Sequence, residues 1–495
     1  MLGALGAFGG LGLLAACSTP AAKTLGPAGA AATSRAAGSP VTVASWVASR
    51  SAPFYIAHRG AGDVYPEHSM QGYRAAVDWG AQSLEVSVNI TSDGVLICMH
   101  DLTYDRTTSG KGLISRQPSS VLNTIGIRQP QLGPAWVQPP LPQIPRLESV
   151  LTEFGGKVVL FLEAKDDNAY RPMMAMVKKM GLLDTVVVKA YWKSTRIPQA
   201  KAAGLPIFSY LSPADMNPAT IARAAKLLGP ADYLVLPVDN GDYVTYYPQA
   251  LIAGAKSHGV PLLVYPIHRR ADAAYYFGLG VSGAVTSDYG YTTSNTAAAT
   301  TDSWASKKIA SGEKPKMPDS KSLAGAWTSV NVFTLAAEGE RQFVTLGQLC
   351  PVASAGSQYQ VRFSASWDRL PRDLTSKVSL ALCHADDRYY EDGLALNEGY
   401  HVTMSPDGVL QIYRHSPSAP DELLGQARTP AVQAGQWAGL RLEVSPQSLI
   451  WTRTDLEGTD RVVVHDSTVR GGYLSIGKSS TDERAMLSLR EFSVG

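Results

Sequence analysis

Residues 54–112 of the chain read FYIAHRGAGDVYPEHSMQGYRAAVDWGAQSLEVSVNITSDGVLICMHDLTYDRTTSGKG. Two short apolar runs in this stretch each end in a histidine: FYIA precedes His58 and VLICM precedes His100. Short apolar runs that are bounded by turn residues predict buried strands. A histidine at the end of such a strand occupies the position where α/β enzymes carry active-site groups. The stretch therefore predicts an active site organised around His58 and His100.

The residues around this stretch predict a strand-helix alternation from about residue 50 to residue 290. Eight strands are predicted at Phe54–Ala57, Ser83–Val88, Val158–Leu162, Val186–Ala190, Pro206–Tyr210, Tyr233–Leu236, Leu262–Tyr265 and Gly283–Thr286. Helical patterns lie between most of them, at Met70–Trp79, Tyr170–Met180, Thr195–Ala203, Pro218–Leu228, Pro248–His258 and Ala271–Gly278. This alternation favours an α/β TIM barrel, (β/α)₈, over an open doubly wound sheet, because no G-x-G-x-x-G motif follows the first strand.

One segment of the predicted barrel allows two interpretations. Asp93-Gly94 is a hairpin signal. The following run, Val95–Met99, either returns beside Ser83–Asn89 or continues the barrel wall. The numbering of the strands depends on which of these holds.

After about residue 325 the pattern changes to short alternating runs separated by turns. Strands are predicted at Phe343–Gly347, Gln358–Ser364, Val378–His384, Tyr400–Met404, Val409–Tyr413, Trp437–Val444, Leu449–Arg453, Arg461–His465 and Tyr473–Ile476. Such spacing is typical of an all-β sandwich, and the end of the chain resembles concanavalin-like jelly rolls. We therefore expect a barrel at 51–291, a linker at 292–324 and a β-sandwich binding module at 325–495.

The first residues indicate export. Met1–Ala16 is apolar and ends in LAAC, which resembles a bacterial lipobox and predicts lipidation at Cys17. We expect a lipoprotein-type signal at 1–17 and a flexible tether at 18–50, with a noncleaved apolar tail as the alternative. The protein would then be anchored on the outer side of the bacterial cytoplasmic membrane or in the periplasm. Cys350 and Cys383 could pair there, and the sequence alone does not decide it.

The charge balance gives no sign of a nucleic-acid partner. The chain has 44 basic and 42 acidic residues, for a net charge of +2. A protein that binds nucleic acid is expected to carry a basic excess. No CxxC motif occurs, so a zinc site of that kind is not predicted.

The motifs of residues 54–112 resemble the glycerophosphodiester phosphodiesterase family, which belongs to the phosphatidylinositol-phospholipase-C-like superfamily of TIM barrels. The family pattern is HRG, PEN, GA-x-x-x-E-x-D, T-x-DG and HD-x-x-x-x-RTT. The matching residues are His58-Arg59-Gly60, Pro66-Glu67-His68, Gly80-Ala81, Glu85-Val86-Ser87, Thr91-Ser92-Asp93-Gly94, His100-Asp101 and Arg106-Thr107-Thr108. Phe161-Leu162-Glu163-Ala164-Lys165 resembles the later I-E-x-K motif. Two departures stand out: His68 replaces Asn, and Ser87 replaces a metal-binding Asp.

The resemblance implies roles for four of these residues. His58 and His100 would act as the acid and the base, in either order, because imidazole titrates near neutral pH. Arg59 would fork onto phosphate oxygens, and Lys165 would add a second positive charge. The cleavage of a phosphodiester needs both kinds of group, because the phosphoryl charge must be neutralised and the leaving alkoxide must be protonated.

The resemblance also implies a divalent cation, Mg²⁺ or Ca²⁺, held by carboxylates. Glu85 and Glu163 would supply two ligands, and Ser87, which lies on the same face of its strand as Glu85, would take the third position weakly. Glu67 is a further candidate ligand in the loop above the first strand. The competing interpretation is that the metal is lost and Glu85 orients Arg59 or Lys165. His68 is a substitute ligand, a third proton carrier or an exposed loop histidine.

The implied function is hydrolysis of a glycerophosphodiester to an alcohol and glycerol phosphate. Tyr191, Trp192 and Tyr265 near strand ends could form a wall for the alcohol or belong to the core. The sandwich would bind a cell-surface glycan or another envelope partner. Two alternatives stay open: a related phospholipid phosphodiesterase with a different head group, and a non-catalytic binding barrel whose metal site has decayed.

Overall fold

The computed structural model describes residues 40–132, 136–137, 139–240, 246–294, 325–329, 331–335, 341–344, 353, 355–371, 377–388, 398–458, 461–479 and 485–495. Cys17, Cys350 and the predicted linker beyond residue 294 lie outside these ranges. The lipidation of Cys17 and the pairing of Cys350 with Cys383 therefore stay predictions. Within the described ranges, no helix has the length and apolar character needed to cross a membrane.

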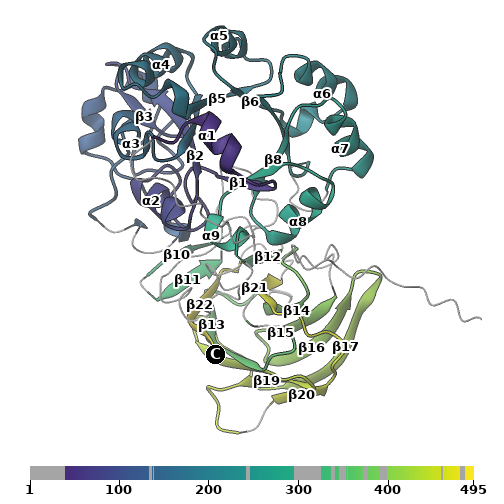
Figure 1. The fold of residues 1–495 in the computed structure, drawn as a ribbon. Coiled ribbons are helices and arrows are strands. Elements are labelled where there is room, and N and C mark those ends of the chain that lie inside the picture. The colour runs from purple at the N-terminus through teal and green to yellow at the C-terminus, as the bar shows by residue number, and fades with distance from the viewer. Residues whose placement is uncertain are drawn as a thin grey trace, which may run out of the picture. The chain divides into compact units, whose positions relative to one another are not determined.

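A closed ring of parallel strands forms the first domain (Figure 1). Its strands are β1 (Phe54–Ala57), β2 (Ser83–Ile90), β4 (Val159–Ala164), β5 (Val186–Tyr191), β6 (Ile207–Tyr210), β7 (Tyr233–Pro237), β8 (Leu262–Ile267) and β9 (Gly283–Thr286). β1 pairs in parallel with both β9 and β2, which closes the ring. The predicted eight-stranded barrel is confirmed. β3 (Leu96–Cys98) pairs antiparallel with β2, so the segment after Asp93-Gly94 returns beside β2 and does not continue the wall.

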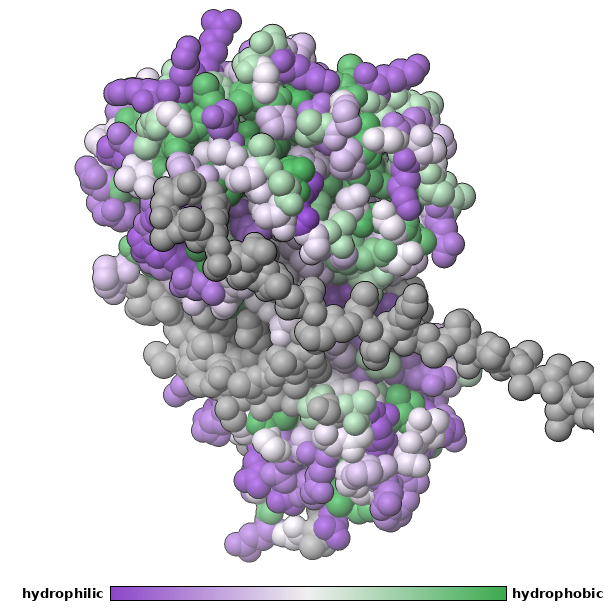
Figure 2. Space-filling view, viewed as in Figure 1, coloured by the Kyte–Doolittle hydropathy of each residue, from purple (hydrophilic) through white to green (hydrophobic). Residues whose placement is uncertain are grey.

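Helices on the outside of the ring cover the strands. They are α2 (Met70–Asp78), α3 (Leu147–Phe154), α4 (Tyr170–Lys179), α5 (Arg196–Ala202), α6 (Pro218–Ala225), α7 (Gln249–Lys256), α8 (Arg270–Gly278) and α9 (Tyr289–Thr292). Local capping sets where α2 and α6 begin, because Ser69 and Asn217 accept hydrogen bonds from Gly72 N–H and Thr220 N–H. Figure 2 shows polar and apolar residues interspersed over this face, as expected for helices that bury only one side.

A short helix fills the end of the barrel where the strands begin. α1 (Val43–Ser49) lies across the opening of the ring (Figure 1), and Trp46 is 3% exposed. The Trp46 ring meets Phe54 and Phe161 edge-on at 5.3 and 5.8 Å. This helix lies inside the stretch for which composition predicted a tether. The ordered barrel therefore begins before residue 50, because Trp46 packs against aromatic side chains inside the ring.

The long segment after His100 packs as a small layer of its own. Its described residues include the 3₁₀ turns η1 (Ile114–Arg116), η2 (Ser119–Asn123) and η3 (Pro130–Leu132). A separate apolar cluster holds it against β3; the cluster is Ile97, Met99, Tyr104, Ile114, Leu122, Ile127 and Ile144. The loop that begins at His100 is thus anchored by burial rather than by a regular element.

The residues from 325 onward form two antiparallel sheets. The first has the order β10 (Gly325–Trp327), β11 (Val332–Leu335), β22 (Leu487–Val494), β13 (Tyr359–Trp367), β18 (Ala438–Val444), β19 (Ser448–Arg453) and β20 (Arg461–His465). The second has the order β12 (Arg341–Val344), β21 (Tyr473–Ser479), β14 (Lys377–His384), β15 (Gly399–Met404), β16 (Val409–Ser416) and β17 (Ala419–Arg428). Trp451 on β19 donates its Nε1–H to Thr403 O on β15 at 3.0 Å, which joins the sheets across one core. The predicted all-β domain is confirmed, and its jelly-roll assignment stays a prediction.

Candidate active site

The chemically active residues gather at the carboxyl ends of the barrel strands. His58 follows the parallel strand β1 and Lys165 follows the parallel strand β4, whereas His100 follows β3, which returns antiparallel beside β2. Glu85 lies on β2, and Glu163 is the next-to-last residue of β4. Parallel strands end at one rim of a barrel, so residues from distant parts of the sequence meet there.

The backbone turns sharply directly after His58. Arg59 and Gly60 have φ values of 54° and 88°, in the left-handed region. A Cβ on Gly60 would lie 2.9 Å from the carbonyl carbon of Gly72 at the start of α2, so no larger residue fits. The turn holds the Arg59 side chain beside His58 at a cost in backbone strain, which is a common feature of functional sites.

Each histidine is held by its Nδ1 atom, so that its Nε2 atom faces the centre of the site. His58 Nδ1 lies 2.7 Å from Ser287 Oγ, and His100 Nδ1 lies 2.9 Å from Asp101 Oδ1. Burial, reinforced by the charge of Arg59, lowers the pKa of His58 well below its usual range. The same two causes lower the pKa of His100 to about 4. Both imidazoles are therefore neutral at pH 7 in the absence of a bound anion.

The two histidines are connected by an unbroken series of charged contacts. The series is His100 Nε2 to Lys165 Nζ at 3.3 Å, Lys165 Nζ to Glu163 Oε1 at 3.2 Å, Glu163 Oε2 to Lys189 Nζ at 2.9 Å, Lys189 Nζ to Glu85 Oε1 at 2.9 Å, and Glu85 Oε1 to His58 Nε2 at 3.8 Å. Although burial opposes ionisation, Lys189 and Lys165 lower the pKa of Glu163. Glu163 and Glu85 raise the pKa of Lys189 against the effect of its own burial. These shifts favour the charged forms of Glu163 and Lys189 at neutral pH.

A second charged network fixes the loop above the first strand. Arg106 forks onto Glu67 at 2.7 and 2.9 Å and onto Asp101 at 2.7 and 2.9 Å. Arg59 Nη1 lies 3.2 Å from Glu67 Oε2. Burial opposes ionisation here too, but the guanidinium groups of Arg106 and Arg59 hold the pKa of Glu67 well below its usual range. Arg106 therefore ties the loop of the first histidine to the loop of the second.

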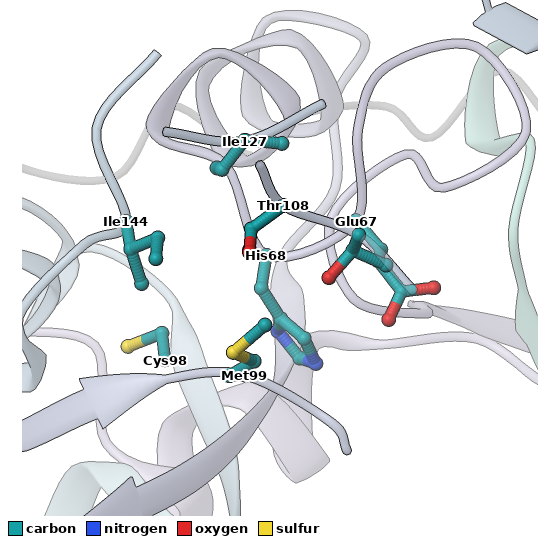
Figure 3. A pocket seen from close by; sticks show the side chains of 8 residues that line it. Glu67, His68, Cys98, Met99, Thr108, Ile127 and Ile144 are labelled. Carbon is teal, nitrogen blue, oxygen red and sulfur yellow. The ribbon is translucent and has the colours of Figure 1, made fainter. Parts of the chain in front are cut away.

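His68 is a buried residue. It is 2% exposed, and its Nδ1 lies 2.7 Å from the hydroxyl of Tyr73. It lines a cavity of about 10 Å³, room for a single water, beside Cys98, Met99, Ile127 and Ile144 (Figure 3). In Figure 3 the carboxylate of Glu67 points away from these apolar side chains. The expectation that His68 is an exposed loop histidine was wrong, because the loop folds back over β3 and α2.

Tyrosines from three strands form one wall near the charged series. Tyr210 donates to Glu163 Oε1 at 2.8 Å, and its ring lies 5.7 Å from Tyr191 and 5.9 Å from Tyr265. Trp192 packs in the core between helices and strands instead. Of the three aromatic residues that the sequence placed near the mouth, Tyr191 and Tyr265 are brought together and Trp192 is not.

The glycerophosphoryl diester phosphodiesterase family model matches residues 58–290, which include every residue of both charged networks. The barrel is similar to this family over nearly all of its length. The relatives that carry this family name are phosphoric diester hydrolases.

Relatives with this family name match the same half of the chain. A glycerophosphodiester phosphodiesterase of Bacillus subtilis is 27% identical over 47% of this chain and 82% of its own length. One from Caldanaerobacter subterraneus is 26% identical over 47% of this chain and 93% of its own. The crystal structure of a glycerophosphodiester phosphodiesterase from Agrobacterium tumefaciens aligns with 48% of this chain and 98% of its own, at 21% identity and a TM-score of 0.38.

The structure brings together the family motif residues named from the sequence and adds groups that the sequence did not indicate. The additions are Lys189, Tyr210, Ser287 and the pair His268–Asp63, whose Nδ1 and Oδ2 atoms lie 2.6 Å apart. Of these, only Lys189 can be noticed in the sequence, because it is a single charged residue inside the apolar run of β5. The others lie in positions where a polar residue at a strand end needs no special explanation.

Members of this family generally use a divalent cation, and the four predicted ligands do not fit one. Glu85 and Glu163 each lie 2.9 Å from the ammonium of Lys189, and Glu67 is engaged by two guanidinium groups. Ser87, the remaining candidate, is neutral and buried. Among the described residues, no group of three or more His, Cys, Asp or Glu side chains is arranged to hold a metal ion. Hard cations need several oxygen ligands that are not already neutralised.

Proposed function

We propose that the barrel hydrolyses glycerophosphodiesters to an alcohol and glycerol phosphate. One observation carries the proposal: the Nε2 atoms of His58 and His100 face the two ends of a single charged series. Cleavage of a phosphodiester needs a proton acceptor and a proton donor on opposite sides of a neutralised phosphate. The match of residues 58–290 to the glycerophosphoryl diester phosphodiesterase family model supports the substrate class.

We assign the base to His100. Its Nδ1 contacts the Asp101 carboxylate, which accepts only hydrogen bonds, so the neutral ring carries its proton on Nδ1 and its lone pair on Nε2. The low pKa of His100 keeps that lone pair available at neutral pH. His100 Nε2 then removes a proton from the attacking water or substrate hydroxyl.

We assign the acid to His58. Its Nε2 lies 3.8 Å from Glu85, whose negative charge favours a protonated ring. Burial and the positive charges of Arg59 and Lys189 oppose protonation and lower the pKa of His58. A bound phosphodiester carries a negative charge that offsets them, so its binding raises the pKa of His58. The ring then takes up a proton from solvent and gives it to the leaving alkoxide.

Arg59 and Lys165 bind the phosphate in this proposal. The fork of Arg59 is aimed by Glu67, and Lys165 Nζ lies within 3.3 Å of both Glu163 and the base His100. Cations placed where phosphoryl charge develops are the largest single contribution to this kind of catalysis. The tyrosine wall beside Lys165 would contact the alcohol part of the substrate.

The test is turnover of glycerophosphocholine with separate detection of all four possible products. We expect choline and glycerol phosphate, because the leaving oxygen must face the proton donor while glycerol stays on the phosphate. Release of phosphocholine and glycerol would contradict the assignment. Turnover confined to lysophospholipids would instead favour a related phosphodiesterase with a different head group.

We propose further that the enzyme works at a membrane, held by a lipid on Cys17. The support is the apolar run that ends in LAAC. Labelling with a clickable palmitate in a bacterial host is expected to mark the protein, and Cys17→Ser is expected to abolish the mark and release the protein from membranes. Retention of the released variant on isolated cell envelopes would support glycan binding by residues 325–495. Loss of retention would contradict it.

A further inference from the structure

Lys189 occupies the centre of the site. It lies on β5, two residues after Val187, which belongs to the apolar cluster inside the barrel. Because side chains alternate along a strand, Lys189 shares the inward face with Val187. The Lys189 side chain is 5% exposed, and its Nζ lies 2.9 Å from both Glu85 Oε1 and Glu163 Oε2.

Two carboxylates thus converge on an ammonium group. These are the carboxylates that the family pattern assigns to a divalent cation. Only Ser87 is left as a third oxygen, and its buried Oγ makes no hydrogen bond within the described residues. A divalent ion bound between Glu85 and Glu163 would lie within a few ångströms of the Lys189 charge, and like charges at that separation repel strongly in a site of low dielectric. The lysine and the ion therefore exclude each other.

The charges of the site balance without a divalent ion. A site with three carboxylates can neutralise a charge of +2 and still hold it firmly, whereas the pair Glu85 and Glu163 already balances the two ammonium groups of Lys189 and Lys165. Serine at position 87 lacks the negative charge of the aspartate in the family pattern, and Lys189 places a positive charge beside Glu85 and Glu163. Both features lower the affinity for a divalent ion.

We propose that the Lys189 ammonium takes the place of the divalent cation, so that this barrel cleaves phosphodiesters without a metal. The proposal rests on the proposed function. An ammonium has three N–H donors. Lys189 donates to Glu85 Oε1 and is ion-paired with Glu163 Oε2, which leaves donor capacity for an oxygen of the phosphate or of the attacking hydroxyl. Lys189 would thus supply a fixed positive charge and a hydrogen bond where the family pattern places an ion.

The first test measures metal binding and turnover separately. Isothermal titration calorimetry with Mg²⁺, Ca²⁺ and Mn²⁺ is expected to show no stoichiometric binding to the unmodified protein. Turnover of glycerophosphocholine is expected to stay within twofold after dialysis against EDTA. Stoichiometric binding of one ion, together with a loss of turnover in EDTA that the ion restores, would overturn the proposal and leave the proposed function intact.

The second test changes the site toward a metal centre. The double variant Ser87→Asp, Lys189→Ala restores three carboxylates and removes the competing charge. It is expected to bind one Mn²⁺, visible by electron paramagnetic resonance, and to lose its turnover in EDTA. If the double variant binds no more Mn²⁺ than the unmodified protein, these residues do not decide metal binding and the proposal fails.

Single substitutions separate the charge of Lys189 from its shape. Lys189→Met is expected to lower kcat by about 10²- to 10³-fold, the usual loss for removing one donor to transition-state charge. Lys189→Arg keeps the charge and is expected to retain more turnover. Lys179→Met on the exposed side of α4 is the matched control and should leave kcat unchanged. Equal kcat values for Lys189→Met and the unmodified protein would contradict the proposal, with circular dichroism verifying that each variant is folded.

Failure of the proposed function gives a different pattern. If no variant turns over glycerophosphocholine or bis(p-nitrophenyl) phosphate, the phosphodiesterase assignment fails. The calorimetric and resonance measurements still decide whether Lys189 excludes a divalent ion, because they do not depend on turnover.

Discussion

Replacing His100 with alanine is expected to lower kcat for glycerophosphocholine by about 10²- to 10⁴-fold, the usual contribution of a positioned proton-transfer group. His58→Ala is expected to cost a similar factor on this substrate, because choline is a poor leaving group that needs a proton. The two variants should differ on bis(p-nitrophenyl) phosphate, whose leaving group departs as a stable anion. His100→Ala should stay impaired there, while His58→Ala should recover most of its activity.

The comparison of the two substrates assigns the two roles. The opposite pattern, in which His100→Ala recovers with the good leaving group, would exchange the acid and the base. Equal losses on both substrates would mean that neither histidine protonates the leaving oxygen. His258→Ala is the matched control, because this exposed histidine follows α7 and lies outside both charged networks. The double variant His58→Ala, His100→Ala should lose little more kcat than either single variant, because the effects of groups that act in one step are not additive.

Replacing Arg106 with methionine is expected to lower the free energy of unfolding by about 3 kcal/mol, near the lower end of the range for breaking a buried ion pair. The reason is that Glu67 loses both of its short contacts to Arg106, and among the described residues the Asp101 carboxylate keeps only His100 as a side-chain partner. The side chains of Arg106, Glu67 and Asp101 are all less than one-third exposed, so water replaces the lost contacts poorly. Urea unfolding monitored through the barrel transition measures the change.

A matched surface pair provides the control for Arg106. Arg74 and Glu153 lie 2.6 Å apart, but the Arg74 side chain is 55% exposed. Arg74→Met is therefore expected to cost less than about 1 kcal/mol. A cost for Arg106→Met no greater than for Arg74→Met would show that the loop network is not a structural tie. Because Asp101 and Glu67 orient His100 and Arg59, Arg106→Met should also lower kcat, and a stability loss without any kcat loss would separate the two roles.

The barrel could be predicted from the sequence because its signal is local and repeated. Apolar runs such as those before His58 and His100 predict strands from neighbouring residues alone. The order of predicted strands and helices then indicates the fold. α1 was missed for the opposite reason. Seven residues carry too little periodicity to be read as a helix, and only the docking of Trp46 onto Phe54 and Phe161 makes this segment part of the barrel.

The sequence by itself determined the family motifs and, through them, His58, His100, Arg59 and Lys165 as the expected active groups. It also showed that Ser87 breaks the carboxylate pattern. Only the tertiary structure decided which positive charge lies between Glu85 and Glu163, since Lys189 comes from a strand about 100 residues after Glu85 and meets it only when the ring closes. The charge balance of a site depends on the distances between strands. Barrel closure sets those distances, and the spacing of residues along the sequence does not reveal them.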